Sequence, residues 1–324
     1  MDRLKIVSGM RPTGPLHIGH LLGVIENWSA LQHAHPSYFF LADWHALTSK
    51  YLDTKTIRQM RIEYVKGWIG AGIDPQKSLI YCQSAVPEVL SLSQVFLCLT
   101  PSGWADRSPS WKDSKLQTDR IHDNLGFYTY PILQSADIAL FKGNLVPVGE
   151  DQVAHIEISR DIIGKFNRLY KEIFPIPEAK LTHVPKLVGV DNTKMSSSKG
   201  NYISLVENEK SLQKKINKMV TDMNRTGITD AGNPDNCSVF SLHKAFSSAN
   251  EVTEVNQGCR GAKLGCGECK MKLGNSMKPK LMPISEKIQK ISDSDVAYVL
   301  ADGNKRAQEI ARATWQEVQT EMEF

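Results

Sequence analysis

Short apolar runs alternate with helix-like segments through the first two-thirds of the chain. Between the runs, apolar residues recur with helical spacing, as at positions 57, 60, 62, 65 and 69. Alternation of strand and helix is typical of a parallel sheet with helices on both faces, so the sequence predicts an α/β fold with a doubly wound parallel sheet. The strand-like runs are residues 4–8, 38–42, 79–82 and 145–148, and the helical segments are 18–32, 54–69, 87–97 and 152–169.

Strand-like runs stop after about residue 190, and the rest of the chain has helical patterns. A Gly/Asn/Asp/Pro loop at 226–236 separates helical segments at 205–219 and 239–249. From Ala307 onward apolar residues recur every three or four positions, which indicates a helix with one buried face. We therefore expect an all-helical C-terminal domain. The predicted division is 1–193 for the sheet domain, 194–204 for a loop, 205–292 for the helical domain and 293–324 for C-terminal helices that pack back on the protein.

Composition excludes several classes of protein. With 324 residues the chain is long enough for two domains, and 41% hydrophobic and 23% charged residues are ordinary values for a globular protein. No apolar run approaches the roughly 18 residues of a membrane span, and the first residues contain no signal-peptide core. Disordered, fibrous and membrane-spanning classes are therefore excluded, and we expect a cytoplasmic protein.

A glycine-rich turn at residues 8–20 joins the first predicted strand to the first helix. In an open parallel sheet ligands bind outside the carboxyl ends of strands, so a nucleotide is expected here. His17 and His20 share one helical face, and with the Thr13 hydroxyl they add donors to a helix N-terminus that favours phosphate. The alternative is a turn with two surface histidines. The spacing matches neither a P-loop nor the dinucleotide fingerprint, which argues against a P-loop NTPase and a dehydrogenase.

A second polar loop, Lys-Met-Ser-Ser-Ser-Lys-Gly-Asn at 194–201, offers two cations and three hydroxyls. Such a loop can close over a triphosphate and stabilise the charge that develops as pyrophosphate leaves. Taken by itself, the segment is equally compatible with a solvated linker or a phosphorylation site.

Together, the Pro-Leu-His-Ile-Gly-His element and the Lys-Met-Ser-Ser-Ser element resemble the HIGH and KMSKS signatures of class I aminoacyl-tRNA synthetases. They stand in the expected order, roughly 175 residues apart. The resemblance implies a Rossmann-like catalytic domain. One position departs from the pattern, because the second lysine of KMSKS is Ser197 here and Lys199 follows two residues later. Either Lys199 takes over its role, or Lys194 and backbone donors suffice.

A third segment bears on the amino acid. Residues 130–138 and 146–152, followed by His155, are similar to the bacterial tryptophanyl-tRNA synthetases, and the similarity covers nearly the whole chain. An indole offers one N–H on a large apolar body, so its pocket needs one acceptor in an apolar shell. Asp137 interrupts an apolar helix, where an unpaired carboxylate is costly, and the resemblance assigns it to the indole N–H; the alternative is a surface carboxylate. The other implied tryptophan-binding residues are Gly9, His45, Tyr130, Gln134, Val146, Val148 and Gln152.

The resemblance also implies the reaction. The carboxylate of L-tryptophan would attack the α-phosphorus of ATP, bound with Mg²⁺, and the tryptophanyl group would pass from the adenylate to tRNA(Trp). Positioning and charge stabilisation carry such a reaction without a covalent enzyme intermediate. A homodimer is implied as well. The expected transition-state contacts are His17, His20, Lys194 and Lys199, and the implied ATP-binding residues are Arg11, Pro12, Thr13, Gly19, His20, Gly149, Glu150, Asp151, Val184, Lys194, Met195, Ser196, Ser197 and Ser198.

Six cysteines are unevenly distributed. Cys82 and Cys98 stand alone in apolar surroundings, which is typical of core thiols. The other four fall within 33 residues, in a Gly-containing stretch that we interpret as rich in loops, and four thiolates can hold a tetrahedral zinc ion or a 4Fe–4S cluster. A subset of tryptophanyl enzymes has a similar four-cysteine pattern with a 4Fe–4S cluster, so the resemblance favours that cluster, with Zn²⁺ as the alternative. The four are Cys237, Cys259, Cys266 and Cys269.

Positive charge is concentrated in the same region. Between Cys259 and Lys290 the sequence contains eight Lys or Arg residues and only two Glu. This local excess of positive charge is greater than the whole-chain net charge of +4. A basic helical stretch is commonly a solvated face, but the phosphate backbone of RNA would fit it too. We expect this region to read the anticodon.

Other functions stay open at this point. Tyrosyl-tRNA synthetase is the first alternative, because tyrosyl enzymes of archaeal type have a similar Ser-Ser-Ser-Lys-Gly-Asn loop and a phenol also suits a carboxylate. The Gly-Glu-Asp-Gln run with His155 and Glu157 favours tryptophan. A non-catalytic RNA-binding paralogue is favoured by the altered KMSKS lysine alone. An iron–sulfur redox protein is the weakest alternative, because the sequence indicates no electron partner.

Overall fold

The computed structural model describes residues 4–116, 120–181, 187–197, 199–227 and 229–324. The chain forms two compact units. The first comprises Met1–Gly14, Val24–His183 and Ser292–Phe324, and the second comprises Pro15–Gly23 and Val184–Ile291. The segment Pro15–Gly23 therefore packs with residues far along the chain, which the predicted boundary at 193 does not anticipate.

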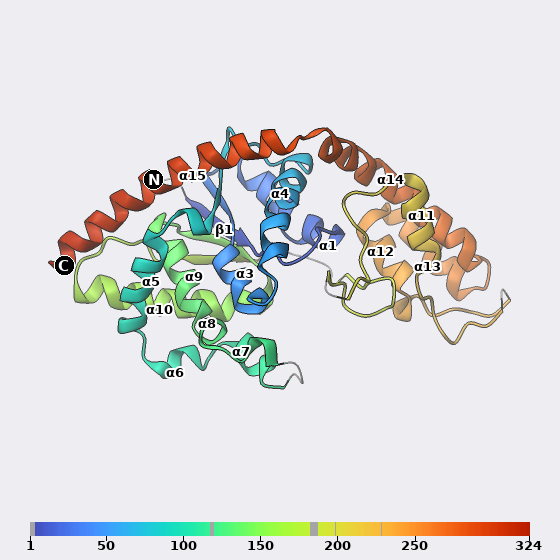
Figure 1. Ribbon diagram of the computed structural model, residues 1–324. Coiled ribbons are helices and arrows are strands. Elements are labelled where there is room, and N and C mark those ends of the chain that lie inside the picture. Colours follow the sequence, from blue (N-terminus) through green and yellow to red (C-terminus); the bar gives the residue numbers. More distant parts are fainter. Residues whose placement is uncertain (1–3, 117–119, 182–186, 198, 228) are drawn as a thin grey trace. The chain divides into compact units, whose positions relative to one another are not determined.

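Within the described residues, the first unit is built on a five-stranded, fully parallel sheet in the order β3–β2–β1–β4–β5. Figure 1 labels β1 in this sheet. Four strands coincide with the predicted apolar runs to within two residues at each end. The fifth was not predicted, because it is a mostly exposed edge strand without an apolar run. The strands are β1 (Ile6–Met10), β2 (Ser37–Leu41), β3 (Ser78–Cys82), β4 (Leu145–Val148) and β5 (Glu178–Leu181).

Helices cover both faces of the sheet, which confirms the doubly wound fold. Successive residues of a strand point to opposite faces. On one face, Phe40 of β2 packs in a core shared with α5 (Glu88–Leu99), α9 (Tyr130–Leu140) and α10 (Val153–Leu169). On the other face, Phe39 stacks on Trp28, and Trp28 meets Trp68 edge-on. Trp28 belongs to α2 (Glu26–Leu31) and Trp68 to α4 (Thr54–Gly70).

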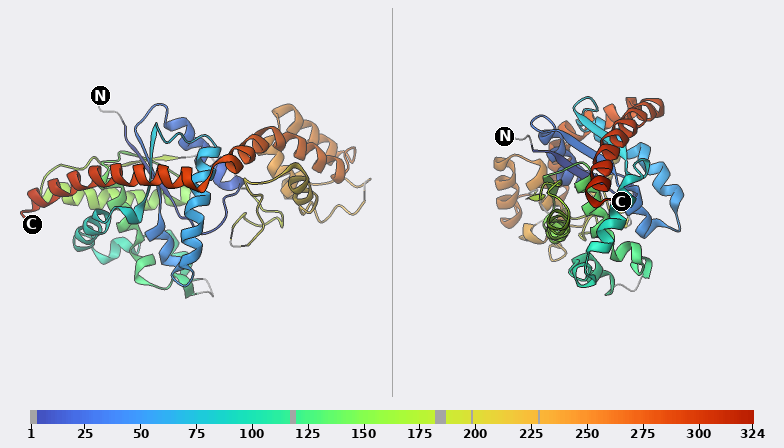
Figure 2. Two further views of the ribbon diagram at one scale, coloured as in Figure 1. Left: turned by 45° about the horizontal axis from the view of Figure 1, so that its top comes forward. Right: turned by 90° about the vertical axis from the view of Figure 1, so that its left-hand side faces the viewer.

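The long helix α15 (Asp293–Met322) covers the free edge of β3, as the views of Figures 1 and 2 show. The N–H of Cys82 donates to Asn304 Oδ1 at 2.8 Å instead of to a further strand. Gly303 allows this approach, because a Cβ there would lie 1.8 Å from the carbonyl oxygen of Ile80. The side chain of Gln308 donates to the carbonyl oxygen of Ala85 at 2.7 Å, just beyond the strand. Helix α15 therefore satisfies backbone groups that an edge strand would otherwise expose.

Short elements complete the part of the chain before residue 187. The predicted helix at 18–32 is divided by a π-helical turn, which is a common feature near functional sites. Its parts are α1 (Ile18–His20), η1 (Leu21–Ile25) and α2. The remaining elements are α3 (Asp43–Lys50), η2 (Gln83–Ala85), α6 (Ser102–Ala105), α7 (Pro109–Ser114), η3 (Arg120–His122), α8 (Leu125–Tyr128) and η4 (Glu150–Gln152).

Helices make up the regular structure of the described residues after 187. In α14 (Cys266–Lys290), buried side chains recur at Leu273, Met277, Leu281 and Ile288, which places one face in the core although Pro279 interrupts the helical hydrogen bonds. Among the described residues, no helix combines the length and hydropathy that a membrane crossing requires. The helices are α11 (Glu209–Asn217), η5 (Pro234–Asn236), α12 (Ser238–Phe246), α13 (Ala249–Arg260) and α14 (Cys266–Lys290).

Several basic residues of the 259–290 segment are engaged within the helical unit. Lys272 pairs with Glu254 at 3.0 Å, and Lys278 pairs with Glu209 at 3.2 Å. Lys270 donates to the carbonyl oxygens of Asn217, the last residue of α11, and of Met219, two residues beyond it. The charge excess therefore contributes partly to packing between helices, and the exposed basic residues include Lys263, Lys287 and Lys290.

Candidate active site

A fully buried carboxylate lies beside the carboxyl end of β3. Asp137 of α9 has no exposed surface, and its Oδ2 is 3.0 Å from His45 Nε2. Gln83, the first residue after β3, donates from Nε2 to both carboxylate oxygens at 2.9 and 2.8 Å. Burial raises the pKa of Asp137, and the hydrogen bonds from His45 and Gln83 oppose that rise. The structure thus brings His45 and Asp137 together, as the resemblance implied, and adds Gln83, which the sequence analysis did not identify.

A second buried network surrounds Tyr130 at the start of α9. Its hydroxyl lies 2.8 Å from His155 Nε2 and 3.0 Å from Ser110 Oγ. His155 Nδ1 in turn lies 2.9 Å from Gln152 Oε1. Burial lowers the pKa of His155 to about 4, so the ring is neutral near pH 7. The network joins the predicted residues Tyr130 and Gln152 through His155, which the sequence analysis named in the motif but not as a site residue.

One amide oxygen in this region has no hydrogen-bond partner among the described residues. Gln134 Oε1, one turn before Asp137 on α9, is buried and receives no donor. An orphaned buried acceptor is costly, so such an atom commonly awaits a ligand or water. Burial raises the pKa of Tyr130, while the Ser110 hydroxyl and the Arg11 guanidinium oppose that rise. The positive charge of Arg11 therefore acts on the same part of the unit.

Three predicted tryptophan-binding residues have packing roles. Val146 and Val148 of β4 lie in a buried apolar cluster with Ile138 and Ile156. Gly9 of β1 accommodates the ring of Phe40, because a Cβ there would lie 2.4 Å from that ring. Their contact with a ligand stays a prediction.

The acidic turn before α10 is exposed. Gly149 precedes η4, and the side chains of Glu150 and Asp151 face solvent. Gln152 Nε2 donates to Asp151 Oδ2 at 3.0 Å. Residues 11–13, which are also predicted to bind the nucleotide, form a tight turn around the buried Pro12. The N–H of Thr13 donates to the carbonyl oxygen of Arg11 at 2.9 Å.

The two signature histidines cap the start of α1 reciprocally. His17 Nδ1 accepts the N–H of Gly19 at 3.1 Å, and the N–H of His17 donates to His20 Nδ1 at 3.2 Å. Burial lowers the pKa of His17 to about 4, and burial together with the neighbouring His17 lowers the pKa of His20 to about 3. Because both rings are neutral near pH 7 and both Nδ1 atoms accept, each ring proton is on Nε2. Each histidine therefore presents an Nε2–H donor and no positive charge.

The second signature loop is bonded to the first. Ser197 Oγ donates to the carbonyl oxygen of Pro15 at 2.9 Å, and the N–H of Ile18 donates to the carbonyl oxygen of Ile203 at 3.0 Å. A Cβ on Gly19 would lie 3.9 Å from Met195 Sδ. Residues separated by more than 170 positions in the sequence are thus neighbours within the second unit.

Asn201 organises the loop, a role that the sequence analysis missed. Its Oδ1 accepts the N–H of Ser196 at 2.8 Å, and its Nδ2 donates to the carbonyl oxygen of Lys194 at 3.1 Å. Lys194 and Lys199 are exposed, and Lys199 Nζ lies 3.5 Å from Thr193 Oγ1 on the same loop. The predicted residues Ser198 and Val184 lie outside the described residues.

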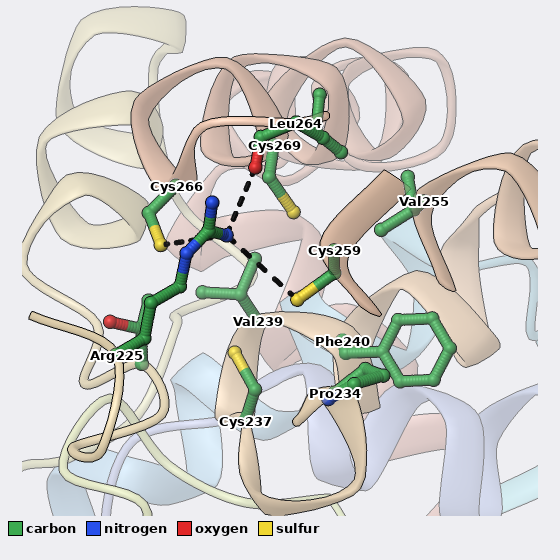
Figure 3. A pocket seen from close by; sticks show the side chains of 11 residues that line it. Arg225, Pro234, Cys237, Val239, Phe240, Val255, Cys259, Leu264, Cys266 and Cys269 are labelled. Atoms are coloured by element: carbon green, nitrogen blue, oxygen red, sulfur yellow. Dashed lines mark hydrogen bonds between the residues drawn. The ribbon is translucent and has the colours of Figure 1, made fainter. Parts of the chain in front are cut away.

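The four clustered cysteines line one pocket, as Figure 3 shows. We expected the four cysteines to lie in a loop-rich stretch, but they lie at helix ends. Cys237 caps α12, Cys259 ends α13, and Cys266 and Cys269 begin α14. The interpretation as a loop-rich stretch was wrong because Gly258 and Gly267 lie within helices. Gly258 leaves room for Leu264, and a Cβ on Gly267 would meet nothing within 4 Å.

Two nitrogen donors approach the sulfur atoms. Arg225 Nη1 lies 4.0 Å from Cys259 Sγ and 3.9 Å from Cys266 Sγ, and His243 Nε2 lies 3.5 Å from Cys269 Sγ. Burial, together with the neighbouring cysteines, raises the pKa of Cys269 to about 12. Among the described residues, no three Cys, His, Asp or Glu side chains converge closely enough to hold a single metal ion. The six cysteines form no disulfide.

Comparison with known proteins defines the class to which this fold and site belong. The family model described as "tRNA synthetases class I (W and Y)" matches residues 1–281. The chain therefore belongs to the class I aminoacyl-tRNA synthetases of the tryptophan and tyrosine group.

Within that group, the reported relatives are tryptophan enzymes. The chain is 45% identical to the tryptophan–tRNA ligase of Thermotoga maritima over 98% of this chain and 99% of that protein. It is 37% identical to the tryptophan–tRNA ligase of Aquifex aeolicus, with similar coverage of 98% and 99%. The solved tryptophanyl-tRNA synthetase of Campylobacter jejuni, complexed with ADP and tryptophan, superposes with a TM-score of 0.86 at 33% identity, covering 99% of this chain and 100% of that one.

Proposed function

We propose that this protein activates L-tryptophan with ATP and attaches it to tRNA(Trp). The observation that carries the proposal is the buried Asp137 carboxylate, which His45 and Gln83 hold on the largely apolar helix α9. A fixed acceptor in an apolar shell suits the single N–H of an indole. A phenol would suit such an acceptor too, and the tryptophan ligases among the relatives favour the indole.

The head group of the amino acid finds complementary partners near Asp137. The orphaned Gln134 Oε1 would accept a hydrogen bond from the substrate ammonium, which would remove the cost of its burial. The Tyr130 hydroxyl and the neutral His155 would complete this side of the pocket. The substrate carboxylate is then the nucleophile, and no protein side chain needs to form a covalent bond.

The nucleotide is assigned to the signature elements. The Nε2–H groups of His17 and His20 would donate to phosphate oxygens without adding charge, and Lys194 and Lys199 would neutralise the pyrophosphate as it leaves. Mg²⁺ would be held mainly by the phosphates of ATP, as is usual for this ion. The bound ion neutralises phosphate charge, and the protein supplies position.

Amino-acid-dependent exchange of pyrophosphate into ATP tests the proposal. We expect exchange with tryptophan and none above background with tyrosine, in the absence of tRNA. Exchange with tyrosine alone would replace the proposed substrate. No exchange with either amino acid, in a folded sample that binds ATP, would favour a non-catalytic RNA-binding role.

We propose further that the four cysteines hold a 4Fe–4S cluster. Burial and, after it, the neighbouring cysteines disfavour the Cys269 thiolate, as its raised pKa indicates, and a cationic cluster core would stabilise the thiolate form. The four thiols line one pocket, and the resemblance to the four-cysteine subset of tryptophanyl enzymes favours a cluster over a zinc ion. The cluster would cross-link the ends of α12, α13 and α14, with Arg225 compensating negative charge.

The remaining proposals concern partners. Exposed basic residues after Cys259, such as Lys263 and Lys287, would contact the tRNA backbone near the anticodon. A cytoplasmic homodimer is expected from the resemblance, and exposed apolar side chains such as Leu90 and Leu97 on α5 suit an interface between copies. Light scattering on the purified protein distinguishes a dimer from a monomer.

A further inference from the structure

A single buried glutamine joins three elements around Asp137. Gln83 has no exposed surface and directly follows β3. Its Oε1 accepts the N–H groups of Trp44 and His45, at 3.1 and 3.3 Å, in the first turn of α3. Its Nε2 donates to both oxygens of Asp137 on α9. Every polar atom of this side chain is therefore engaged.

The orientation of the Gln83 amide is fixed by these partners. If the amide were flipped, its oxygen would face the Asp137 carboxylate and its N–H groups would face two backbone donors. Both contacts would be repulsive inside a buried region, where unpaired polar groups are costly. The backbone N–H groups at the start of α3 polarise the amide oxygen, which strengthens the Nε2 donor toward the carboxylate.

The position of Gln83 is fixed as well, because its neighbour is anchored. The N–H and the hydroxyl of Ser84 donate to Asp43 at 2.8 and 2.6 Å, and Asp43 pairs with Arg61 at 2.5 Å. Asp43 begins α3 and Arg61 lies in α4, so the turn after β3 is clamped to two helices. Gln83 is thus a rigid donor rather than a mobile side chain.

The hydrogen bonds leave one acceptor position on the carboxylate. A carboxylate oxygen accepts about two hydrogen bonds. Oδ2 receives His45 and Gln83, so both of its positions are used, whereas among the described residues Oδ1 receives Gln83 alone. A ring N–H of the substrate would therefore bind Oδ1, which Gln83 holds in place.

We propose that Gln83 is a positioning residue that presents Asp137 Oδ1 to the ring N–H of the substrate and thereby sets the preference for an aromatic ring that carries this donor. The proposal rests on the proposed function and names a residue that acts through Asp137. Gln83 itself does not touch the reacting atoms.

Two substitutions at position 83 test the proposal. Gln83→Leu removes the amide at similar size, and Gln83→Glu keeps the acceptor for α3 but removes the donor. The matched control is Gln32→Leu, because Gln32 is a buried glutamine whose amide is also bonded at both ends, to Gly72 at 2.8 Å and to Asp74 at 2.9 Å. Gln32 is bonded near the opposite end of β3, through the hydroxyl of Ser78.

The readout compares tryptophan with benzothienylalanine, in which sulfur replaces the ring N–H. We expect Gln83→Leu to lower the ratio of the two kcat/KM values in pyrophosphate exchange about tenfold, and Gln83→Glu to lower it at least as much. The KM for ATP should change less than twofold. Gln32→Leu should leave the ratio at its parental value even if it lowers the Tm as much.

Loss of activity toward both amino acids in equal proportion, with an unchanged ratio, would overturn the proposal. Calorimetric binding of each amino acid without ATP provides a second measure of the same ratio. If the parent binds tryptophan but shows no exchange, the proposed function fails, while a lowered binding ratio in Gln83→Leu still supports the role of Gln83. If one variant fails to fold, the other carries the test.

Discussion

The hydroxyl of Ser197 donates to the carbonyl oxygen of Pro15 at 2.9 Å, which joins the two signature elements across 182 residues of sequence. Ser197 occupies the position where a lysine is expected in the KMSKS signature. The side chain at this position therefore anchors the loop. The cationic role stays a prediction, which we assign to Lys194 and Lys199.

Removal of each lysine should separate their roles. We expect Lys194→Ala to lower kcat for pyrophosphate exchange about 100-fold and Lys199→Ala about tenfold, because each loses charge stabilisation of the leaving pyrophosphate. The KM for tryptophan should be unchanged. Lys210→Ala, at an exposed position on α11, is the control. A fully active Lys194→Ala variant would contradict the assignment.

Substitution of Asp137 should affect the amino acid and not the nucleotide. Asp137→Asn places an amide nitrogen against the donors of His45 and Gln83, so we expect the KM for tryptophan to rise about 10- to 100-fold. The KM for ATP should change less than twofold. Asp161→Asn, which alters an exposed carboxylate on α10 paired with Arg107, should behave as the parent. An equal rise in both KM values would indicate a general structural defect instead.

The signature histidines should make the protein less stable in acid. Their folded pKa values of about 4 and about 3 lie below the ordinary value of 6.5, so the unfolded chain takes up protons first as the pH falls. These groups contribute nothing to the pH dependence above about 6.5, and stability is lost from about pH 6.5 down to about pH 4 for His17 and about pH 3 for His20. In the double variant His17→Asn/His20→Asn, asparagine can still cap α1. We expect the urea midpoint of this variant to drop less between pH 7 and pH 5 than the urea midpoint of the parent. Equal drops in both proteins would refute this linkage.

The close approach of α15 to β3 should be sensitive to one methyl group. Gly303→Ala would place a Cβ against the carbonyl oxygen of Ile80, so we expect a loss of about 2–4 kcal/mol in the free energy of unfolding. Gly103→Ala in α6 is the control, because a Cβ there meets nothing within 4 Å. Urea unfolding of both variants provides the measurement, and a parental midpoint for Gly303→Ala would show that α15 can shift without cost.

Metal content should depend on the clustered cysteines. In protein purified without oxygen, we expect about four iron atoms and acid-labile sulfide per chain, and Cys266→Ser should lose most of both. Cys98 is exposed on α5, so the expectation of a core thiol was wrong for this residue, and Cys98→Ser should retain the iron and sulfide. One zinc per chain and no sulfide would replace the cluster by the tetrahedral alternative.

Much of the fold follows from local pattern. Buried strands such as β2 and β3 are continuous apolar runs, so the sequence predicted them, whereas β5 is an exposed edge strand that its pairing with β4 stabilises. The grouping of the four cysteines was predicted from spacing, but their placement at helix ends depends on packing among α12, α13 and α14.

The candidate site divides in the same way. Asp137 was recognisable because a charge within an apolar helix is costly, and the two signatures were recognisable as motifs. Gln83 has no such pattern, since a single polar residue after a strand has many possible roles. Its position on the carboxyl end of a parallel strand was the available signal. Its partners on α3 and α9 are set by tertiary structure.

The cover that α15 provides for β3 has a consequence for the order of folding. All five strands precede α15 in the chain, so during synthesis the sheet can assemble while the backbone groups of β3 are still open along one side. Such an edge can pair with another nascent chain. A chain in which residues 293–322 have not yet packed on β3 therefore leaves that edge open to self-association.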